Sequence, residues 1–349
     1  MARFSWPLVV VAVMTLRSTP VASQTAPASS PQLAVSGVMF GQYAYALRSL
    51  PAGGHANNFD VTRAYLTFTG KFADGVGSRV TADIYRNADG SLAYRLKYGF
   101  ASWNPKGSAL TYKLGMIQTP FVEFNEQLWD YRVQGSDPTD RAGYLSSSDF
   151  GLGVDGSWGG DKVTLNAGVY NGEFYSKAPG DQHKDVAARV SVRLLASDET
   201  SRLGGLRLTG FTLVGQPNGG GTRERFLGQM SYRSKKFWLA AELMGTRDRT
   251  DTGTAVLPTV SGRLISAYGV VKVGPKSKIG LLGRFDAHDR NTATADDALS
   301  RIIAGVSYQV NANLRGVANV DHTWYQGGSP TPALDAARSQ LLMQVQINF

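Results

Sequence analysis

The last eleven residues, 339–349, read SQLLMQVQINF and change character at almost every position. Leu341, Met343, Val345, Ile347 and Phe349 fall on one side of this alternation, and Gln340, Gln344, Gln346 and Asn348 fall on the other. Successive side chains of a β-strand point to opposite faces of the sheet. The stretch therefore predicts a strand with one apolar face and one polar face.

The same two-residue period recurs along most of the chain. Segments that show it lie near residues 33–47, 58–72, 76–86, 92–103, 109–118, 150–158, 162–171, 184–195, 205–216, 223–233, 236–247, 262–273, 277–288, 300–310, 313–325 and 339–349. Sixteen strands of this kind in one chain predict an all-β protein.

The connections between these segments alternate in length. Tight turns rich in Gly, Asp, Asn, Pro and Lys are expected at 73–75, 159–161, 234–235, 274–276 and 311–312, with 196–204 as a longer exception. Longer connections are expected at 48–57, 119–149, 172–183, 248–261, 289–299 and 326–338. Short turns at one end and long loops at the other are typical of an up-and-down transmembrane barrel.

The strand faces distinguish a membrane barrel from a soluble sandwich. A barrel strand that spans a bilayer needs about 9–11 residues with an apolar outside and a polar inside, and closure leaves no unpaired edge in lipid. Aromatic residues near the strand ends fit the two membrane interfaces; they are Tyr43, Tyr45, Phe68, Phe72, Tyr98, Phe100, Trp158, Tyr232, Phe237, Trp324 and Phe349. The sequence thus predicts a transmembrane antiparallel β-barrel of about sixteen strands.

Residues 1–23 have the features of a secretory signal peptide. Arg3 precedes the short apolar run 7–16, and Val21-Ala22-Ser23 supplies small residues for cleavage. The alternative is an N-terminal anchor, although the run is shorter than the roughly 20 residues of a membrane-spanning helix. The barrel domain is then expected to occupy residues 24–349. Loss of Arg3 and Arg17 lowers the formal charge from +9 to +7.

Several function classes are disfavoured by composition. Cysteine is absent, so thiolate metal sites and Cys nucleophiles are excluded. The Lys and Arg residues are spread singly instead of clustering as they do in nucleic-acid binding proteins. The chain holds no His-Glu-x-x-His and no Gly-x-Ser-x-Gly. We therefore expect no enzyme, no catalytic residue, no cofactor and no metal.

The stretch 59–72 (FDVTRAYLTFTGKF), the following 79–83 (RVTAD) and the terminal Phe349 carry a family resemblance. Together with the alternating strands, they resemble the phosphate-selective porin O and P family of outer-membrane porins. The resemblance implies a sixteen-stranded barrel in the bacterial outer membrane, a homotrimer, and a loop after the fifth strand that folds inward. It also implies that Phe349 is a signal for the barrel assembly machinery.

The longest connection, 119–149, follows the fifth predicted strand and is therefore the expected constriction loop. Its charged residues include Glu123, Glu126, Asp130, Arg132, Asp137, Asp140 and Arg141, and with Asp149 they sum to −4. Unstructured loops of this length are uncommon in compact domains, and its aromatic residues argue against disorder. The alternative is a solvated outer loop packed on a trimer neighbour.

Basic residues occupy the polar phase of many strands and are expected to line the pore. They are Arg63, Arg79, Arg95, Lys97, Lys113, Arg189, Arg193, Arg207, Arg284, Arg301 and Arg315. Such a side chain facing lipid at the bilayer midplane would cost about 2–4 kcal/mol. Any one of them can instead form a salt bridge with a wall carboxylate such as Asp83 or Asp321.

These features predict a passive diffusion pore for small hydrophilic solutes, with a mild preference for anions and possible use by phosphate. An acidic loop opposite a basic wall favours a general pore, because dedicated phosphate binding needs converging cations without nearby carboxylates. Two alternatives remain open. One is a channel for a specific substrate such as a sugar, and the other is a structural or adhesive barrel with a plugged lumen.

Overall fold

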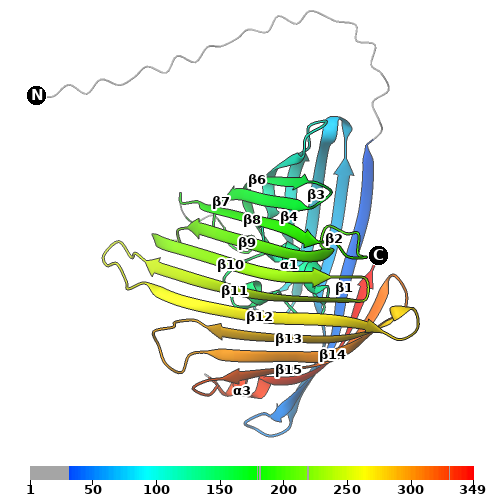
Figure 1. The fold of residues 1–349 in the computed structure, drawn as a ribbon. Helices are drawn as coiled ribbons and strands as arrows, with labels where there is room; N and C mark the ends of the chain where they lie inside the picture. Colours follow the sequence, from blue (N-terminus) through cyan, green and yellow to red (C-terminus); the bar gives the residue numbers. More distant parts are fainter. Residues whose placement is uncertain (1–30, 179, 181, 218–219, 330) are drawn as a thin grey trace, which may run out of the picture.

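The computed structural model describes residues 31–178, 180, 182–217, 220–329 and 331–349. These residues form one closed antiparallel barrel of sixteen strands, in which each strand pairs with its chain neighbours and β1 pairs with β16 (Figure 1). The predicted fold class is confirmed. The predicted signal peptide, residues 1–23, and the first residues of the expected barrel domain lie outside the described residues.

The strands are β1 (Gln32–Ser49), β2 (His55–Lys71), β3 (Val76–Arg86), β4 (Leu92–Trp103), β5 (Leu110–Gln118), β6 (Ser148–Trp158), β7 (Val163–Tyr170), β8 (Asp185–Leu195), β9 (Gly205–Gly215), β10 (Gly221–Arg233), β11 (Phe237–Thr250), β12 (Val260–Val273), β13 (Ile279–Asp289), β14 (Leu299–Gln309), β15 (Leu314–Tyr325) and β16 (Ser339–Asn348). Each predicted segment overlaps one strand, and every boundary agrees within three residues. Alternating polarity therefore located all of the membrane-spanning elements.

Three short α-helices lie outside the strands. Helices α1 (Val122–Trp129) and α2 (Pro138–Arg141) lie between β5 and β6, and α3 (Pro332–Ala337) lies between β15 and β16. Single 3₁₀ turns, η1 (Ala73–Gly75) and η2 (Pro275–Ser277), occupy two of the tight connections. None of the helices in the described part of the chain has the length and hydropathy needed to cross a bilayer.

The tight turns depend on residues that adopt left-handed backbone conformations. Asp74 has a φ of 55° and is followed by Gly75 at 76°, whereas Lys276 has a φ of 56° and lies two residues after Gly274 at 76°. One connection differs from the expected lengths. The loop predicted at 48–57 shrinks to residues 50–54, because β1 and β2 continue past the expected ends as a long hairpin.

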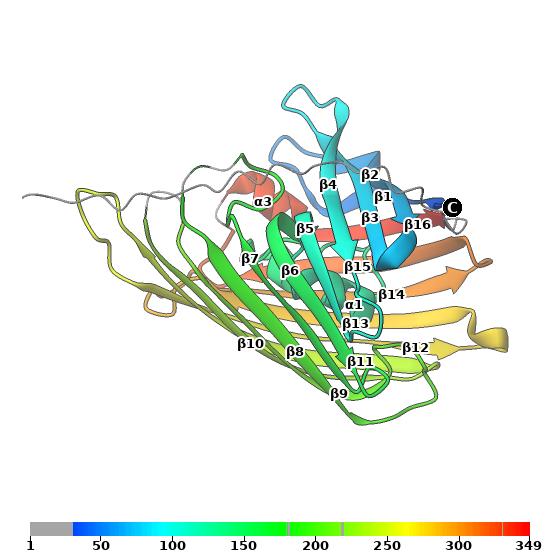
Figure 2. The same ribbon diagram turned by 90° about the horizontal axis from the view of Figure 1, so that it is seen from above.

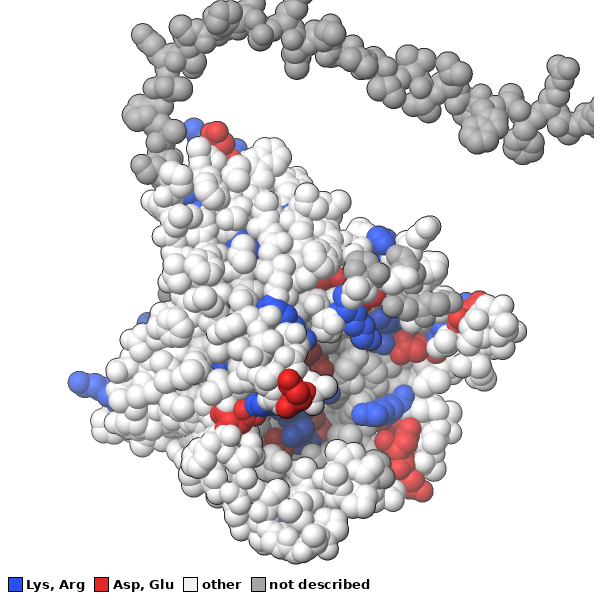
Figure 3. All heavy atoms as spheres, turned by 180° about the vertical axis from the view of Figure 1, so that it is seen from behind, with Lys and Arg blue, Asp and Glu red and all other residues white. Residues whose placement is uncertain are grey.

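The outer surface is apolar and the charges lie elsewhere. On β9, for example, Leu208 and Val214 are exposed on the outside, whereas Arg207 and Thr209 are buried on the inside. In the space-filling view of Figure 3, acidic and basic side chains gather in and around a hollow, and most of the remaining surface of this face is uncharged. This distribution is the one that a barrel surrounded by lipid requires.

Two expectations about aromatic residues are corrected by the register of β4. Tyr98 and Phe100 face the interior, and Tyr98 is only 3% exposed. The reason is a β-bulge, because β3 residues Thr81 and Ala82 pair with Tyr98 and Leu96 and leave Lys97 as an extra residue. Beyond the bulge, Trp103 lies on the outer face and is 50% exposed.

The C-terminal residue helps to close the barrel. The backbone amide of Phe349 donates a hydrogen bond to the Gly37 carbonyl at 3.0 Å, and the Phe349 carbonyl accepts one from the Gly37 amide at 2.8 Å. The Phe349 ring lies directly over Gly37, where a Cβ atom would approach ring carbons to 2.2 Å. A larger residue at position 37 would therefore displace the terminal ring, and glycine allows the ring to lie over this strand.

The cost of placing a charged residue on the outer face should depend on its depth in the bilayer, and β14 allows a test of this dependence. Val306 lies in the middle of the outward row of β14 and is 43% exposed, whereas Ser300 lies near its end. We expect Val306→Arg to lower the free energy of unfolding by about 2–4 kcal/mol and Ser300→Arg by about 0–1 kcal/mol. Urea unfolding in lipid vesicles measures both values. Equal losses would contradict a bilayer around this strand.

Candidate functional site

The segment between β5 and β6, residues 119–147, lies inside the barrel. Figure 2 shows α1 within the ring of strands, and Phe121, Leu128 and Trp129 are at most 1% exposed. The segment contacts inner side chains on several sides of the ring, among them Phe40 of β1, Phe211 of β9 and Gln344 of β16. Its position agrees with the predicted inward-folded loop and not with the alternative of a solvated outer loop.

An apolar cluster holds the middle of the segment against the later strands. Leu128, Trp129 and Tyr131 pack with inner residues of the wall, and the Trp129 and Tyr268 rings meet edge to face at 5.2 Å. The wall residues of this cluster are Phe40, Trp238, Ala240, Tyr268, Val270, Leu282, Ile303 and Val317. Burial of these large side chains fixes the segment to one side of the lumen.

A second apolar cluster holds the start and the end of the segment. Phe121, Val122 and Leu145 pack against Ile117, Tyr170, Ala187, Phe211, Leu213, Leu227, Met244 and Leu264. The prediction of a uniformly polar inner face did not include these wall residues. Their signal in the sequence was that β9 has apolar residues in both phases, as in Leu206-Arg207-Leu208 followed by Phe211-Thr212-Leu213. A strand that is apolar on both faces is covered on both.

Asn125 of α1 joins the segment to the wall through a buried polar network. Its side-chain amide donates to Asp137 and to Glu242 of β11, the latter at 2.9 Å. Its carbonyl oxygen accepts from Gln229 at 2.7 Å and from the Tyr268 hydroxyl. Hydrogen bonds among buried groups are costly to leave unmade, so the network fixes the rotation of α1.

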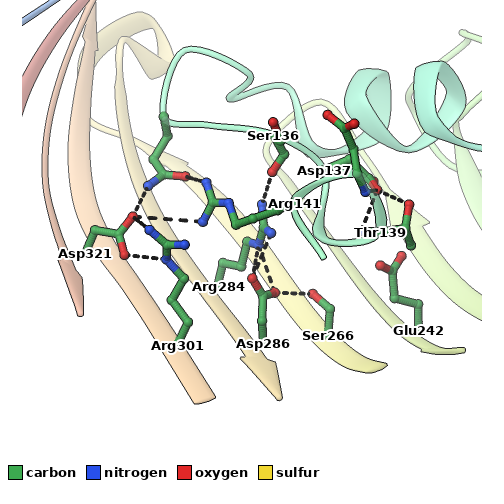
Figure 4. Close-up of polar contacts among 12 residues, drawn as sticks. Ser136, Asp137, Thr139, Arg141, Glu242, Ser266, Arg284, Asp286, Arg301 and Asp321 are labelled. Atoms are coloured by element: carbon green, nitrogen blue, oxygen red, sulfur yellow. Dashed lines mark hydrogen bonds and ion pairs between the residues drawn. The ribbon is translucent and has the colours of Figure 1, made fainter. Parts of the chain in front are cut away.

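Arginines from β13 and β14 meet the part of the segment that follows α1 (Figure 4). Arg284 pairs with Asp286 at 2.7 Å and donates to the Ser136 carbonyl at 2.8 Å. Arg301 pairs with Asp321 at 2.5 Å, and the same carboxylate accepts from Gln134 at 3.0 Å.

Other charges of the segment are also matched at short range. Arg315 donates to the Asp130 carbonyl at 2.6 Å and lies 3.3 Å from its carboxylate. Within the segment, Arg132 pairs with Glu126 at 2.5 Å. Arg141 lies 3.9 Å from Asp321, and Asp140 occupies the first turn of α2. Ion pairs therefore join the segment to the wall. The acidic segment and the basic wall neutralise each other at these contacts and do not face each other as two separate charged surfaces.

Open space remains on the other side of the segment, towards β2–β8. One cavity of about 350 Å³ is lined by Arg79, Lys113, Glu123, Asp155 and Arg189, among others. Arg79 and Glu123 form an ion pair at 3.0 Å that also lines a second cavity of about 270 Å³. Lys113 pairs with Asp155. The Arg79–Glu123 pair therefore lies where the two cavities meet.

Arg189 completes the larger cavity. It donates to the Pro120 carbonyl at 2.7 Å, and its guanidinium lies 4.1 Å from the centre of the Phe124 ring. A charge held by a carbonyl and an aromatic face keeps its positive sign towards the cavity, since neither partner neutralises it.

The smaller cavity adjoins a group of cations on β2–β4. Lys97, placed inward by the bulge, donates to the Tyr65 hydroxyl at 3.1 Å. Arg95 donates to the Tyr175 hydroxyl at 3.0 Å, and Arg63 lies 3.9 Å from Asp83. Hydroxyl partners leave the charges of Lys97 and Arg95 unneutralised, whereas the partner of Arg63 is a carboxylate.

Arg193 and Arg207, also expected to line the pore, contact the β6–β7 turn. Arg193 donates to the Gly160 carbonyl at 2.7 Å, and Arg207 donates to the Asp161 carbonyl at 2.5 Å. The turn has positive φ at Gly159, Gly160 and Asp161, which directs its carbonyls towards these guanidinium groups. Both residues therefore stabilise a turn at the end of the barrel that carries the short connections.

Two carboxylates of the segment have different proton affinities. Burial favours the neutral form of Glu123, but the adjacent Arg79 guanidinium outweighs this effect and lowers its pKa below the ordinary value. Burial raises the pKa of Asp137 to about 6, although Thr139, Arg284 and Asn125 act in the opposite direction. No cluster suited to a metal ion occurs among the described His, Asp and Glu residues.

The chain was compared with protein-family profiles, curated protein sequences and solved structures. No protein-family profile matches the chain, and no curated protein sequence matches it. Among solved structures, it is similar to an anion-selective porin from Comamonas acidovorans, with a TM-score of 0.66 and 12% identity over 92% of this chain and 100% of that chain. The chain thus has the architecture of an outer-membrane β-barrel protein, and more specifically the fold of porins.

Two further structures support the same fold. The trimer form of in-vitro folded OmpT, an outer membrane protein of Vibrio cholerae, matches with a TM-score of 0.63 and 11% identity, over 92% of this chain and 100% of that chain. A Salmonella typhi OmpF complex with daunomycin matches with a TM-score of 0.62 and 12% identity, over 91% and 97%.

The buried Asp137 leads to a pH prediction. Its raised pKa means that the folded protein binds this proton more tightly than the unfolded chain does. The resulting stabilisation is fully present below about pH 4 and is lost as the pH rises through about 6. Asp137→Asn is neutral at every pH and keeps an N-cap acceptor for α2.

We therefore expect the unfolding temperature of Asp137→Asn, relative to wild type, to rise between pH 4 and pH 6. Thermal unfolding in detergent, followed at several pH values, measures this difference. Asp140→Asn, which removes the other acid at the start of α2, is the matched control for the loss of one carboxylate from this helix. A flat curve for Asp137→Asn would contradict the assignment.

Proposed function

We propose that the chain is an outer-membrane porin, a passive channel for small hydrophilic solutes. The observation that supports this most is the charged space between segment 119–147 and β2–β8, inside a barrel with an apolar outer surface. The Arg79–Glu123 pair is the proposed narrowest point, and solutes pass between the segment and the basic residues of β2–β8. Segment 119–147 is the proposed constriction loop.

The proposal includes a mild preference for anions. Lys97, Arg95 and Arg189 bind hydroxyl groups or a carbonyl and keep their charge, whereas the carboxylates Glu123 and Asp155 already pair with cations. The carboxylates nearby disfavour a dedicated phosphate site. Phosphate is one permeating anion among several, and the resemblance of residues 59–72 to the phosphate-selective porin O and P family belongs to this proposal.

The proposal also covers how the barrel is assembled in the membrane and with other copies of itself. Bilayer lipid surrounds the apolar outer face, and three copies form a homotrimer, as the OmpT structure's trimer form suggests for that protein. Phe349, which is 65% exposed at the closing strand, is the proposed recognition signal for the barrel assembly machinery.

A structural barrel is the second candidate, because two apolar clusters and a buried polar network fill much of the interior. Purified protein added to planar lipid bilayers separates the two. Stepwise increases of conductance are expected for the porin. Folded protein that inserts without conductance would favour the structural barrel.

Charge substitutions at the narrowest point test the anion preference. Arg79→Gln combined with Lys113→Gln should lower the anion-to-cation permeability ratio about two- to threefold, because it removes two cations from the cavity wall. Glu123→Gln should raise the ratio by a similar factor, because it leaves Arg79 unpaired. Reversal potentials in a salt gradient give the ratios. Changes of the same sign in both variants would place the passage elsewhere.

A further inference from the structure

Arginine side chains project from the outer face of the barrel on β11 and β12. Burial alternates along both strands, so that Thr246, Gly262 and Leu264 are buried and face inward. Arg247, Arg249 and Arg263 occupy the opposite phase and are exposed. These three residues, named here the outer arginine patch, break the rule that charges of this barrel face the lumen.

The length of the apolar belt places the patch at a membrane interface. On β11 the outward row runs from Phe237 to Gly245, and on β12 it runs from Ile265 to Val273. Each row spans about nine residues, which is the length of strand that crosses the hydrocarbon region. Arg247 and Arg263 are the next outward residues. They therefore lie just above the belt, where Arg costs only about 0–1 kcal/mol.

The patch lies at the end of the barrel that carries the long loops. Arg249 and Arg263 flank the connection 251–259, whereas the short turns 234–236 and 274–278 lie at the other ends of the same strands. Long loops face the exterior in barrels of this architecture. The patch therefore faces the headgroups of the outer leaflet.

Two of the three guanidinium groups lack a protein partner. Arg247 lies 3.7 Å from Glu224 of β10, a long ion pair on the surface. Over the described part of the chain, Arg249 and Arg263 take part in no ion pair and no side-chain hydrogen bond, although Asp289 lies opposite Arg263 in the β12–β13 register. The basic residues of the inner wall, by contrast, all contact a protein group.

The strand register brings the patch together. Arg247 pairs with Ser261 and Gly245 pairs with Arg263, so Arg247 and Arg263 are diagonal neighbours on the same face. Diagonal neighbours have Cα atoms about 7–8 Å apart, and Arg249 is two residues beyond Arg247 on the same strand. The long side chains of Arg247 and Arg263 can converge on one phosphate group at this spacing, and Arg249 extends the patch farther from Arg263. Arg suits this role because its planar fork binds phosphate oxygens in pairs.

We propose that the outer arginine patch binds the phosphorylated headgroup of a glycolipid in the outer leaflet. The apolar belt below it, including Leu243 and Ile265, contacts the acyl chains of the same lipid. The inference rests on the proposed membrane location but not on conduction through the lumen.

The test measures lipid binding by native mass spectrometry of the purified full-length barrel in detergent. The probe is diphosphoryl lipid A, with its fully dephosphorylated form in a parallel arm. The variant is Arg249→Gln with Arg263→Gln. The control variant is Lys235→Gln with Lys236→Gln, which removes two exposed charges from a short turn at the other end of the barrel.

Wild type and the lysine control should bind diphosphoryl lipid A about tenfold more tightly than the arginine variant does. The dephosphorylated lipid should bind wild type as weakly as diphosphoryl lipid A binds the arginine variant. Equal binding by both variants, or equal binding of both lipids by wild type, would overturn the proposal. Displacement of the lipid by millimolar inorganic phosphate would also overturn it, because a free-anion site would then explain the patch.

Planar-bilayer conductance of the same preparations separates this proposal from the proposed function. Both variants should conduct as wild type does, since neither pair lies in the lumen. A barrel that binds the lipid without conducting would contradict the porin function and leave the lipid site intact. A barrel that conducts but binds the two lipids equally would support the porin function and contradict the lipid site.

Discussion

The structure depends on the satisfaction of backbone hydrogen bonds in a medium without water. Sixteen strands can lie in a bilayer only if the first and last pair, because an open edge would leave peptide groups unpaired in hydrocarbon. The β1–β16 ladder and the reciprocal bonds between Gly37 and Phe349 provide this closure. Once the cylinder is closed, each strand has one face for lipid and one for the interior, and the alternation of side chains follows.

The interior is divided by segment 119–147 into a filled side and an open side. On the filled side, Trp129 and Tyr131 pack against apolar wall residues, and Asn125 links Asp137 to Glu242. On the open side, basic residues of β2–β8 meet the Arg79–Glu123 pair. Apolar burial and charged open space are therefore separated within one lumen, so the segment can be rigid while its exposed edge stays charged.

Charged residues differ in role between the interior of the barrel and its outer face. Inner arginines such as Arg284 and Arg315 hold the segment in place, whereas Lys97 and Arg189 keep their charge towards open space. The outer arginine patch lies beyond the apolar belt, where exposure to headgroups replaces exposure to hydrocarbon. The net positive charge of the chain thus comes from basic residues in different places with different contacts. The value of the net charge does not reveal where any of these residues lies.

The sequence by itself determined the strands, their two faces and the tight turns, because side-chain alternation and turn residues such as Asp74 and Gly75 are local features. It also located the long connection after β5, and the family resemblance predicted that this connection folds inward. Tertiary structure decided the partners: the bulge that turns Lys97 and Tyr98 inward, the wall residues that receive Trp129, and the pairing of Arg79 with Glu123. These contacts join residues distant in the chain, and their geometry depends on closure and register, which no local pattern encodes.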